Sequence, residues 1–145
     1  MLTDATLQLS SAQAVTSTAV SVNTIDMGPQ QAAVRDPMAA VITVDQSAVG
    51  AGATVQFQVV SSSAADLSGP TVLASSGAIG VADLVASRAP IVVETDFANM
   101  PGSHRYVGLR YLVAGGPLTA GKFSCALADD AVSVGKFYPG GVNVA

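Results

Sequence analysis

The sequence predicts an all-β protein: a single antiparallel β-sandwich, jelly-roll-like, with extended terminal arms. Three observations lead to this prediction. Apolar residues recur with a period of two, turn signals rich in Gly and Pro separate these segments, and helical patterns are scarce. The length of 145 residues suits one domain, residues 1–145, which is large enough to bury a core.

The strongest strand signals are segments in which apolar and more polar residues alternate, because successive side chains of a strand point to opposite faces. They are residues 55–59, 107–113 and 123–127. Segments rich in β-branched residues predict further strands. These are residues 18–25, 39–45, 71–75, 78–81 and 90–95. Single helical turns are expected at residues 63–67 and 81–85.

The two ends of the chain carry weaker patterns. Residues 1–17 are rich in Ser, Thr and Ala, and residues 136–145 join two aromatic residues to a Gly-rich turn. We expect both ends to be either arms packed on a neighbouring subunit or edge strands of the same sandwich. The candidate interface residues in these ends are Leu7, Leu9, Phe137, Tyr138, Val142 and Val144.

Charge is unusually sparse along this chain. Charged residues make up 11 % of it, against roughly 25 % in a typical soluble domain. A surface with so few charges suits a protein that other proteins cover. With six Lys and Arg under a net charge of −4, the chain lacks the basic footprint of a nucleic-acid binder. No run of about 20 apolar residues predicts a membrane span, and the first residues do not predict a secretory signal.

Two sequence patterns resemble known binding sites but lack the residues or the geometry that those sites require. The Gly-x-x-x-x-Gly-Lys spacing of residues 116–122 matches a phosphate-binding loop, but Phe123 stands where a magnesium-ligating Ser or Thr is required. The segment is therefore expected to be a hairpin loop. Asp129 and Asp130 are adjacent, so in a strand their carboxylates would point to opposite faces.

Single reactive residues do not assemble into a predicted site either. Cys125 has no partner cysteine and is expected to be a small buried hydrophobe. His104 opens a strand and is not accompanied by a Gly-x-Ser-x-Gly elbow, so a surface or strand-edge histidine is expected. No metal-ligand spacing is present. We therefore expect no enzyme, no cofactor and no metal site.

One predicted strand face has the composition of a protein interface. Arg110 should share that face with Tyr106 and His104. Arg and Tyr on an otherwise weakly charged face are typical of interface hot spots. The alternative is a solvated sheet face that carries an amphipathic Tyr.

The order of several segments resembles a known family. In chain order they are Leu9-Ser-Ser-Ala-Gln-Ala-Val15, Ser21-Val-Asn-Thr-Ile-Asp-Met-Gly28, Asp36-Pro37, Val55-Gln-Phe-Gln-Val59, Ser76-Gly-Ala-Ile-Gly-Val-Ala-Asp-Leu84, Arg105-Tyr-Val-Gly-Leu-Arg-Tyr111, Gly116-Pro-Leu-Thr-Ala-Gly121 and Phe137-Tyr-Pro-Gly-Gly-Val-Asn-Val144. Over residues 7–145 this series is similar to the small capsid cement (decoration) proteins of tailed bacteriophages, the Bordetella phage cement protein family.

The resemblance implies a structural virion protein. It implies a jelly-roll sandwich on the outer surface of the icosahedral phage head, where it braces neighbouring subunits of the major capsid protein. It also implies a homo-oligomer, with a homodimer favoured and a trimer as the alternative. Assembly in the reducing host cytoplasm agrees with one unpaired cysteine. The family has no catalytic residues to carry over.

Two other classes of function remain open. A carbohydrate-binding or adhesin-type β-sandwich would stack aromatic rings on sugars, and the chain has no Trp and three Tyr. A hydrolase would have to build its site around His104.

Overall fold

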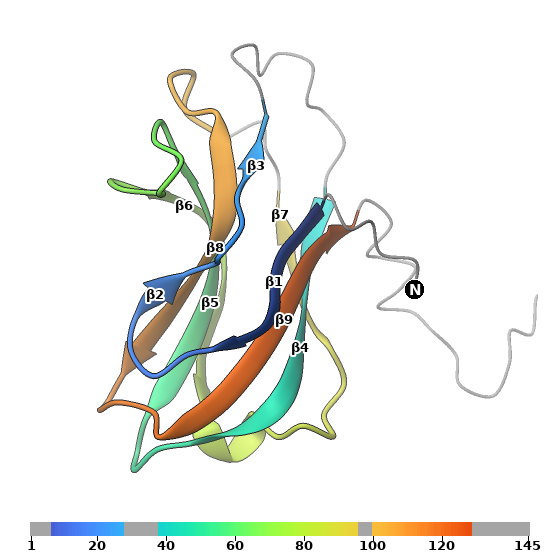
Figure 1. The fold of residues 1–145 in the computed structure, drawn as a ribbon, viewed down its shortest axis with the longest axis vertical. Helices are drawn as coiled ribbons and strands as arrows, with labels where there is room; N and C mark the ends of the chain where they lie inside the picture. Colours follow the sequence, from blue (N-terminus) through green and yellow to red (C-terminus); the bar gives the residue numbers. More distant parts are fainter. Residues whose placement is uncertain (1–6, 28–37, 96–99, 129–145) are drawn as a thin grey trace, which may run out of the picture.

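The computed structural model describes residues 7–27, 38–95 and 100–128, and these form two antiparallel sheets packed face to face (Figure 1). The predicted β-sandwich is therefore confirmed. The strands are β1 (Gln8–Ala14), β2 (Ala19–Val20), β3 (Ile25–Asp26), β4 (Met38–Val49), β5 (Thr54–Ser62), β6 (Thr71–Gly80), β7 (Ile91–Thr95), β8 (Tyr106–Ala114) and β9 (Ala120–Ala128). A short 3-10 helix, η3 (Val81–Asp83), follows β6.

The strand pairs are nested around one hairpin. The four-stranded sheet has the order β1-β9-β4-β7, and the five-stranded sheet has the order β2-β8-β5-β6, with β3 also on β8. The pairs β5–β6, β4–β7, β2–β8 and β1–β9 are all antiparallel and enclose one another in the sequence. The hairpin β5–β6 is the innermost pair and β1–β9 is the outermost.

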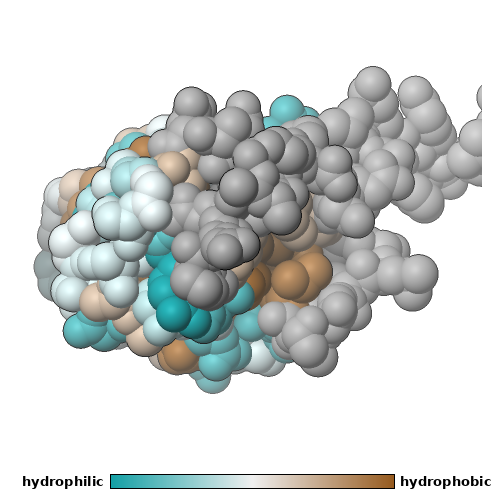
Figure 2. Space-filling view, turned by 90° about the horizontal axis from the view of Figure 1, so that it is seen from above, coloured by the Kyte–Doolittle hydropathy of each residue, from teal (hydrophilic) through white to brown (hydrophobic). Residues whose placement is uncertain are grey.

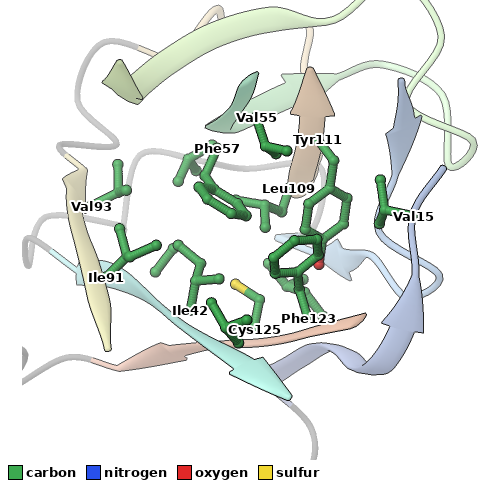
Figure 3. Close-up of a cluster of buried hydrophobic side chains, with 14 of the residues drawn as sticks. Val15, Ile42, Val55, Phe57, Ile91, Val93, Leu109, Tyr111, Phe123 and Cys125 are labelled. Carbon is green, nitrogen blue, oxygen red and sulfur yellow. The ribbon is translucent and has the colours of Figure 1, made fainter. Parts of the chain in front are cut away.

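The core fills the space between the sheets, and strand alternation explains its membership (Figure 3). Phe57 from β5 and Tyr111 from β8 point inward from the five-stranded sheet, and Phe123 from β9 meets them from the other sheet. Cys125 lies among these side chains and is 1 % exposed. Segments that alternate in the sequence thus form central strands, because one face of each is buried.

The weaker strand predictions are corrected in detail. Residues 18–25 do not form one strand, because the backbone leaves β8 between β2 and β3. Residues 71–75 and 78–80 belong to one strand, β6, in which Gly77 has a φ of +76° at a shift of the pairing register. Val81 instead begins η3, which lies within the helical turn expected at residues 81–85. Residues 63–67 contain a turn, in which the N–H of Leu67 donates to the carbonyl of Ala64, but they form no helix.

The N-terminal segment that was expected as an arm or an edge strand contains β1, which pairs with β9. Leu9 is fully buried in the core, so the structure contradicts its prediction as an interface residue. Leu7 packs against the same core and is partly buried. The candidates Phe137, Tyr138, Val142 and Val144 lie outside the described residues.

A chain of polar contacts closes the side of the sandwich between β1 and β8. The Tyr111 hydroxyl donates to Ser10 Oγ at 2.8 Å, and Ser10 Oγ donates to Gln13 Oε1 at 2.7 Å. Gln13 Nε2 then donates to the carbonyl of Val20 in β2 at 2.9 Å. These bonds satisfy polar groups at the rim of an apolar core, where an unpaired group would be costly.

Burial raises the pKa of the Cys125 thiol from 9.0 to about 12. In the unfolded chain the thiol ionises at its ordinary pKa, whereas the folded protein keeps it protonated. The buried, protonated thiol therefore makes its full contribution to the free energy of unfolding below pH 9. This contribution is lost as the pH rises from about 9 to about 12.

We predict that Cys125→Ala flattens the decline of unfolding free energy with pH above pH 9. Urea unfolding of both proteins at several pH values between 7 and 11 measures this decline. Tyr111 is also buried and contributes its own decline, so the variant should lose only part of the slope. An unchanged slope would contradict the assignment to Cys125.

Candidate interface on the outer face of the five-stranded sheet

Strand β8 positions the predicted interface residues. Val107, Leu109 and Tyr111 are core residues, so the alternate positions Tyr106, Gly108 and Arg110 lie on the outer face of the sheet. Tyr106 and Arg110 are both partly exposed there. The sequence therefore places these two side chains on the correct face.

His104 does not join this face. Its Nδ1 lies 2.9 Å from Ser61 Oγ, and Ser61 pairs with Val107, whose side chain is in the core. Cross-strand partners share a face, so the His104 ring turns to the side opposite Tyr106. The prediction failed because residue 104 precedes β8 in a turn, where its N–H donates to the carbonyl of Pro101 and strand alternation does not apply.

Arg110 is anchored on the face by its cross-strand partner. Its Nε donates to Gln58 Oε1 at 2.7 Å, and the Gln58 side chain is nearly buried. The bond uses one of the five guanidinium N–H donors and fixes the plane of the group. Arg110 stays partly exposed on the face.

Near Tyr106 the face continues into an ion pair. Arg105 binds Asp26 of β3 through two bonds, Nε to Oδ1 at 2.8 Å and Nη2 to Oδ2 at 2.5 Å. Its guanidinium also lies 5.3 Å from the centre of the Tyr106 ring. The pair is solvent-exposed, so it contributes more to geometry than to stability. Seen from above, the protein surface has a strongly hydrophilic area directly beside a hydrophobic area (Figure 2).

The centre of the face is already occupied by a side chain of the same protein. Leu67, from the loop after β5, is 2 % exposed and lies over Gly108. A Cβ built on Gly108 would lie 2.4 Å from Leu67 Cδ1. Gly108 therefore provides the space that Leu67 fills, between Tyr106 and Arg110.

Polar contacts hold the loop that carries Leu67. Ser62 Oγ accepts from the backbone N–H of Ala64 and donates to the carbonyl of Ser68. Asp66 Oδ1 accepts from the backbone N–H of Ser68, and this bond lowers the pKa of the Asp66 carboxyl. Leu67 itself has a φ of +59°, which a Leu adopts only at a cost. Sequence reasoning missed Leu67, although the Gly in an otherwise bulky strand was a signal of close approach.

The surroundings of His104 bear on the hydrolase alternative. Ser61, which contacts His104, is fully buried, so a substrate has no access to its hydroxyl. In residues 7–27, 38–95 and 100–128 no group of three or more His, Cys, Asp and Glu is arranged to hold a metal. In the same ranges no helix is long and apolar enough to cross a membrane.

We predict that Gly108→Ala lowers the free energy of unfolding by about 1–3 kcal/mol, because its methyl group collides with Leu67. Chemical denaturation measures the loss. Gly80→Ala is the matched control, since a Cβ there meets nothing within 4 Å. Adding Leu67→Ala to Gly108→Ala should restore part of the loss, and strictly additive effects would contradict the contact.

Comparison with known proteins places the chain in a family. No curated protein matches it. The family model Bbp16 matches residues 9–127, which begin in β1 and end in β9 and so include both sheets. The chain belongs to the Bbp16 family, a family of Bordetella phage proteins.

Proposed function

We propose that this protein is a cement (decoration) protein that binds the outside of the phage head and braces neighbouring subunits of the major capsid protein. The observation that carries the proposal is the match of a phage protein family to the whole described sandwich. The proposal adds a location and a partner to that family membership.

The distribution of exposed apolar side chains supports a bracing role. A brace must contact at least two neighbours, so it needs contact surfaces on separate parts of its body. Val22 is 68 % exposed in the connection between β2 and β3, while Val49 and Val85 are 52 % and 38 % exposed near the end of β4. The backbone N–H of Ala48 donates to the carbonyl of Leu84, which brings the last two valines close together.

The outer face around Leu67 supports the same role in a different way. Tyr106 and Arg110 are partly exposed on either side of the buried Leu67, and the bond from Arg110 Nε to Gln58 Oε1 already holds one of them, so less side-chain entropy has to be lost when a partner covers them. Many such modest contacts, repeated around a shell, hold more strongly than any one of them. We propose that the protein also contacts itself, with a homodimer favoured over a trimer.

We predict that the purified protein binds phage heads assembled without it, and saturates them. Cosedimentation with such heads measures the binding, and electron microscopy of the saturated heads locates the added density. Purified tails are the control particle. Binding to tails alone, or to neither particle, would contradict the cement function.

The C-terminal candidates give a second prediction. Removal of residues 137–145, which carry Phe137, Tyr138, Val142 and Val144, should weaken head binding or self-association more than it lowers the melting temperature. Removal of residues 1–10 is not a matched control, because it deletes Leu9 and Ser10 from the packed sandwich. Removal of residues 1–6 leaves β1 intact and serves instead. A C-terminal truncation that loses fold and binding equally would assign these residues to the fold.

A further inference from the structure

Strand β6 offers a sheet edge to other chains. In the four-stranded sheet the two edge strands are β1 and β7. The edge of β1 is closed by Asn23, whose N–H donates to the carbonyl of Leu9. The other edge strand, β7, is short and carries the exposed Glu94. By contrast, β6 has ten residues, of which none is charged and none is buried. Long uncharged edges are the ones that add a strand from another protein.

The hydrogen-bond pattern identifies the part of β6 that can accept a strand. The N–H of Val81 donates to the carbonyl of Ala53, so the backbone groups of Val81 point toward the chain that leads into β5. Inward and outward groups alternate in an antiparallel pair, so the backbone groups of Ala78 and Gly80 point away from β5. The register shift near Gly77 interrupts the pairing, which resumes at Ser75, so the regular stretch next to η3 is residues 78–80.

An open groove of about 580 Å³ runs beside these residues. Ile79 and Val85 contribute apolar walls, and Arg88 and Asp83 contribute charge. Arg88 is held by backbone oxygens: its Nη1 donates to the carbonyl of Asp83 at 2.9 Å and its Nε to that of Ala89 at 3.3 Å. Within the described residues, no carboxylate lies at ion-pair distance from Arg88.

We propose that an extended segment of the head subunit, bearing a carboxylate side chain, binds in this groove as an added strand on residues 78–80. Its backbone pairs with the outward groups of Ala78 and Gly80, and its carboxylate pairs with Arg88. The guanidinium is already fixed in place, which favours a two-bond contact with a carboxylate. This inference rests on the proposed cement function and specifies where and how the head subunit is held.

The geometry of Gly80 supplies a sharp test. Its φ is −66° and its ψ is 149°, which suit proline, and a Cβ there meets nothing within 4 Å. Gly80→Pro therefore removes the outward N–H without disturbing the ladder with β5. Gly80→Ala adds a side chain but keeps the N–H. We expect Gly80→Pro to weaken binding to heads assembled without the protein by about tenfold, and Gly80→Ala by no more than about twofold.

Arg88 provides an independent test in the same binding measurement. Arg88→Gln removes the charge and should also weaken head binding by about tenfold. Lys122→Gln, at an exposed cation on the four-stranded sheet, is the matched control and should change binding by no more than about twofold. Raised salt should weaken binding of the wild-type protein more than that of Arg88→Gln.

The outcomes separate this inference from the function on which it rests. If the wild-type protein does not bind heads, the cement function is wrong. If it binds, and Gly80→Pro and Arg88→Gln bind like their controls, the cement function stands and the groove proposal is wrong. Thermal melting checks the fold of each variant. If Gly80→Pro proves unstable, backbone hydrogen exchange of residues 78–80 is compared between free and head-bound wild-type protein. Exchange that is the same in both states overturns the proposal. Protection that arises at high protein concentration without heads would assign the groove to a second copy and also overturn it.

Discussion

Three aromatic rings join the two sheets, and the positions of the surface residues depend on them. Phe57 and Tyr111 come from the five-stranded sheet and Phe123 comes from the four-stranded sheet. The centres of the rings lie 5.3–5.8 Å apart, and two of the three pairs meet edge to face. A shift of β8 by one residue would turn Tyr111 outward and Arg110 into the core. The packing of these rings therefore determines which residues of β5, β8 and β9 face a partner.

The same rings explain how the β1 edge is closed. Tyr111 spans the core and its hydroxyl reaches Ser10 on the opposite sheet, so one residue contributes to the apolar packing and to the polar rim. On the far side of the sandwich, the side-chain bonds of β6 in the described residues stay within one sheet: Ser75 Oγ accepts from Gln56 Nε2, and Ser76 Oγ accepts from the N–H of Phe57. Arg88, near β6, is bonded to backbone oxygens of its own segment. One side of the sandwich thus has side-chain bonds that join the two sheets, and the other side has an open groove.

The sequence was sufficient where a residue's environment repeats along a strand. Alternation located β5, β8 and β9 and placed Tyr106 and Arg110 on the outer face. It failed at β1, because this strand pairs through two register shifts and Ala12 has a φ of +46°, which removes the period of two. The weak pattern of this end predicts a contact role for Leu9, which is a core residue. Leu67 and His104 lie in loops, where the direction of a side chain depends on tertiary contacts that no local pattern records.

The nested order of the strand pairs also has a consequence for folding. The first strand, β1, pairs with the last described strand, β9, so their contacts join positions such as Gln8 and Ala126 that are far apart in the chain. Closing so long a loop is entropically costly, and folds rich in non-local pairing fold slowly. Among the described residues, the strand that pairs with β1 is β9, so during synthesis β1 cannot join a sheet until β9 has been made, and Phe123 reaches the core at the same late stage. A chain interrupted before β9 therefore lacks both a completed sheet and the ring that joins the sheets, and it should remain exposed to proteolysis rather than persist as a partly functional subunit.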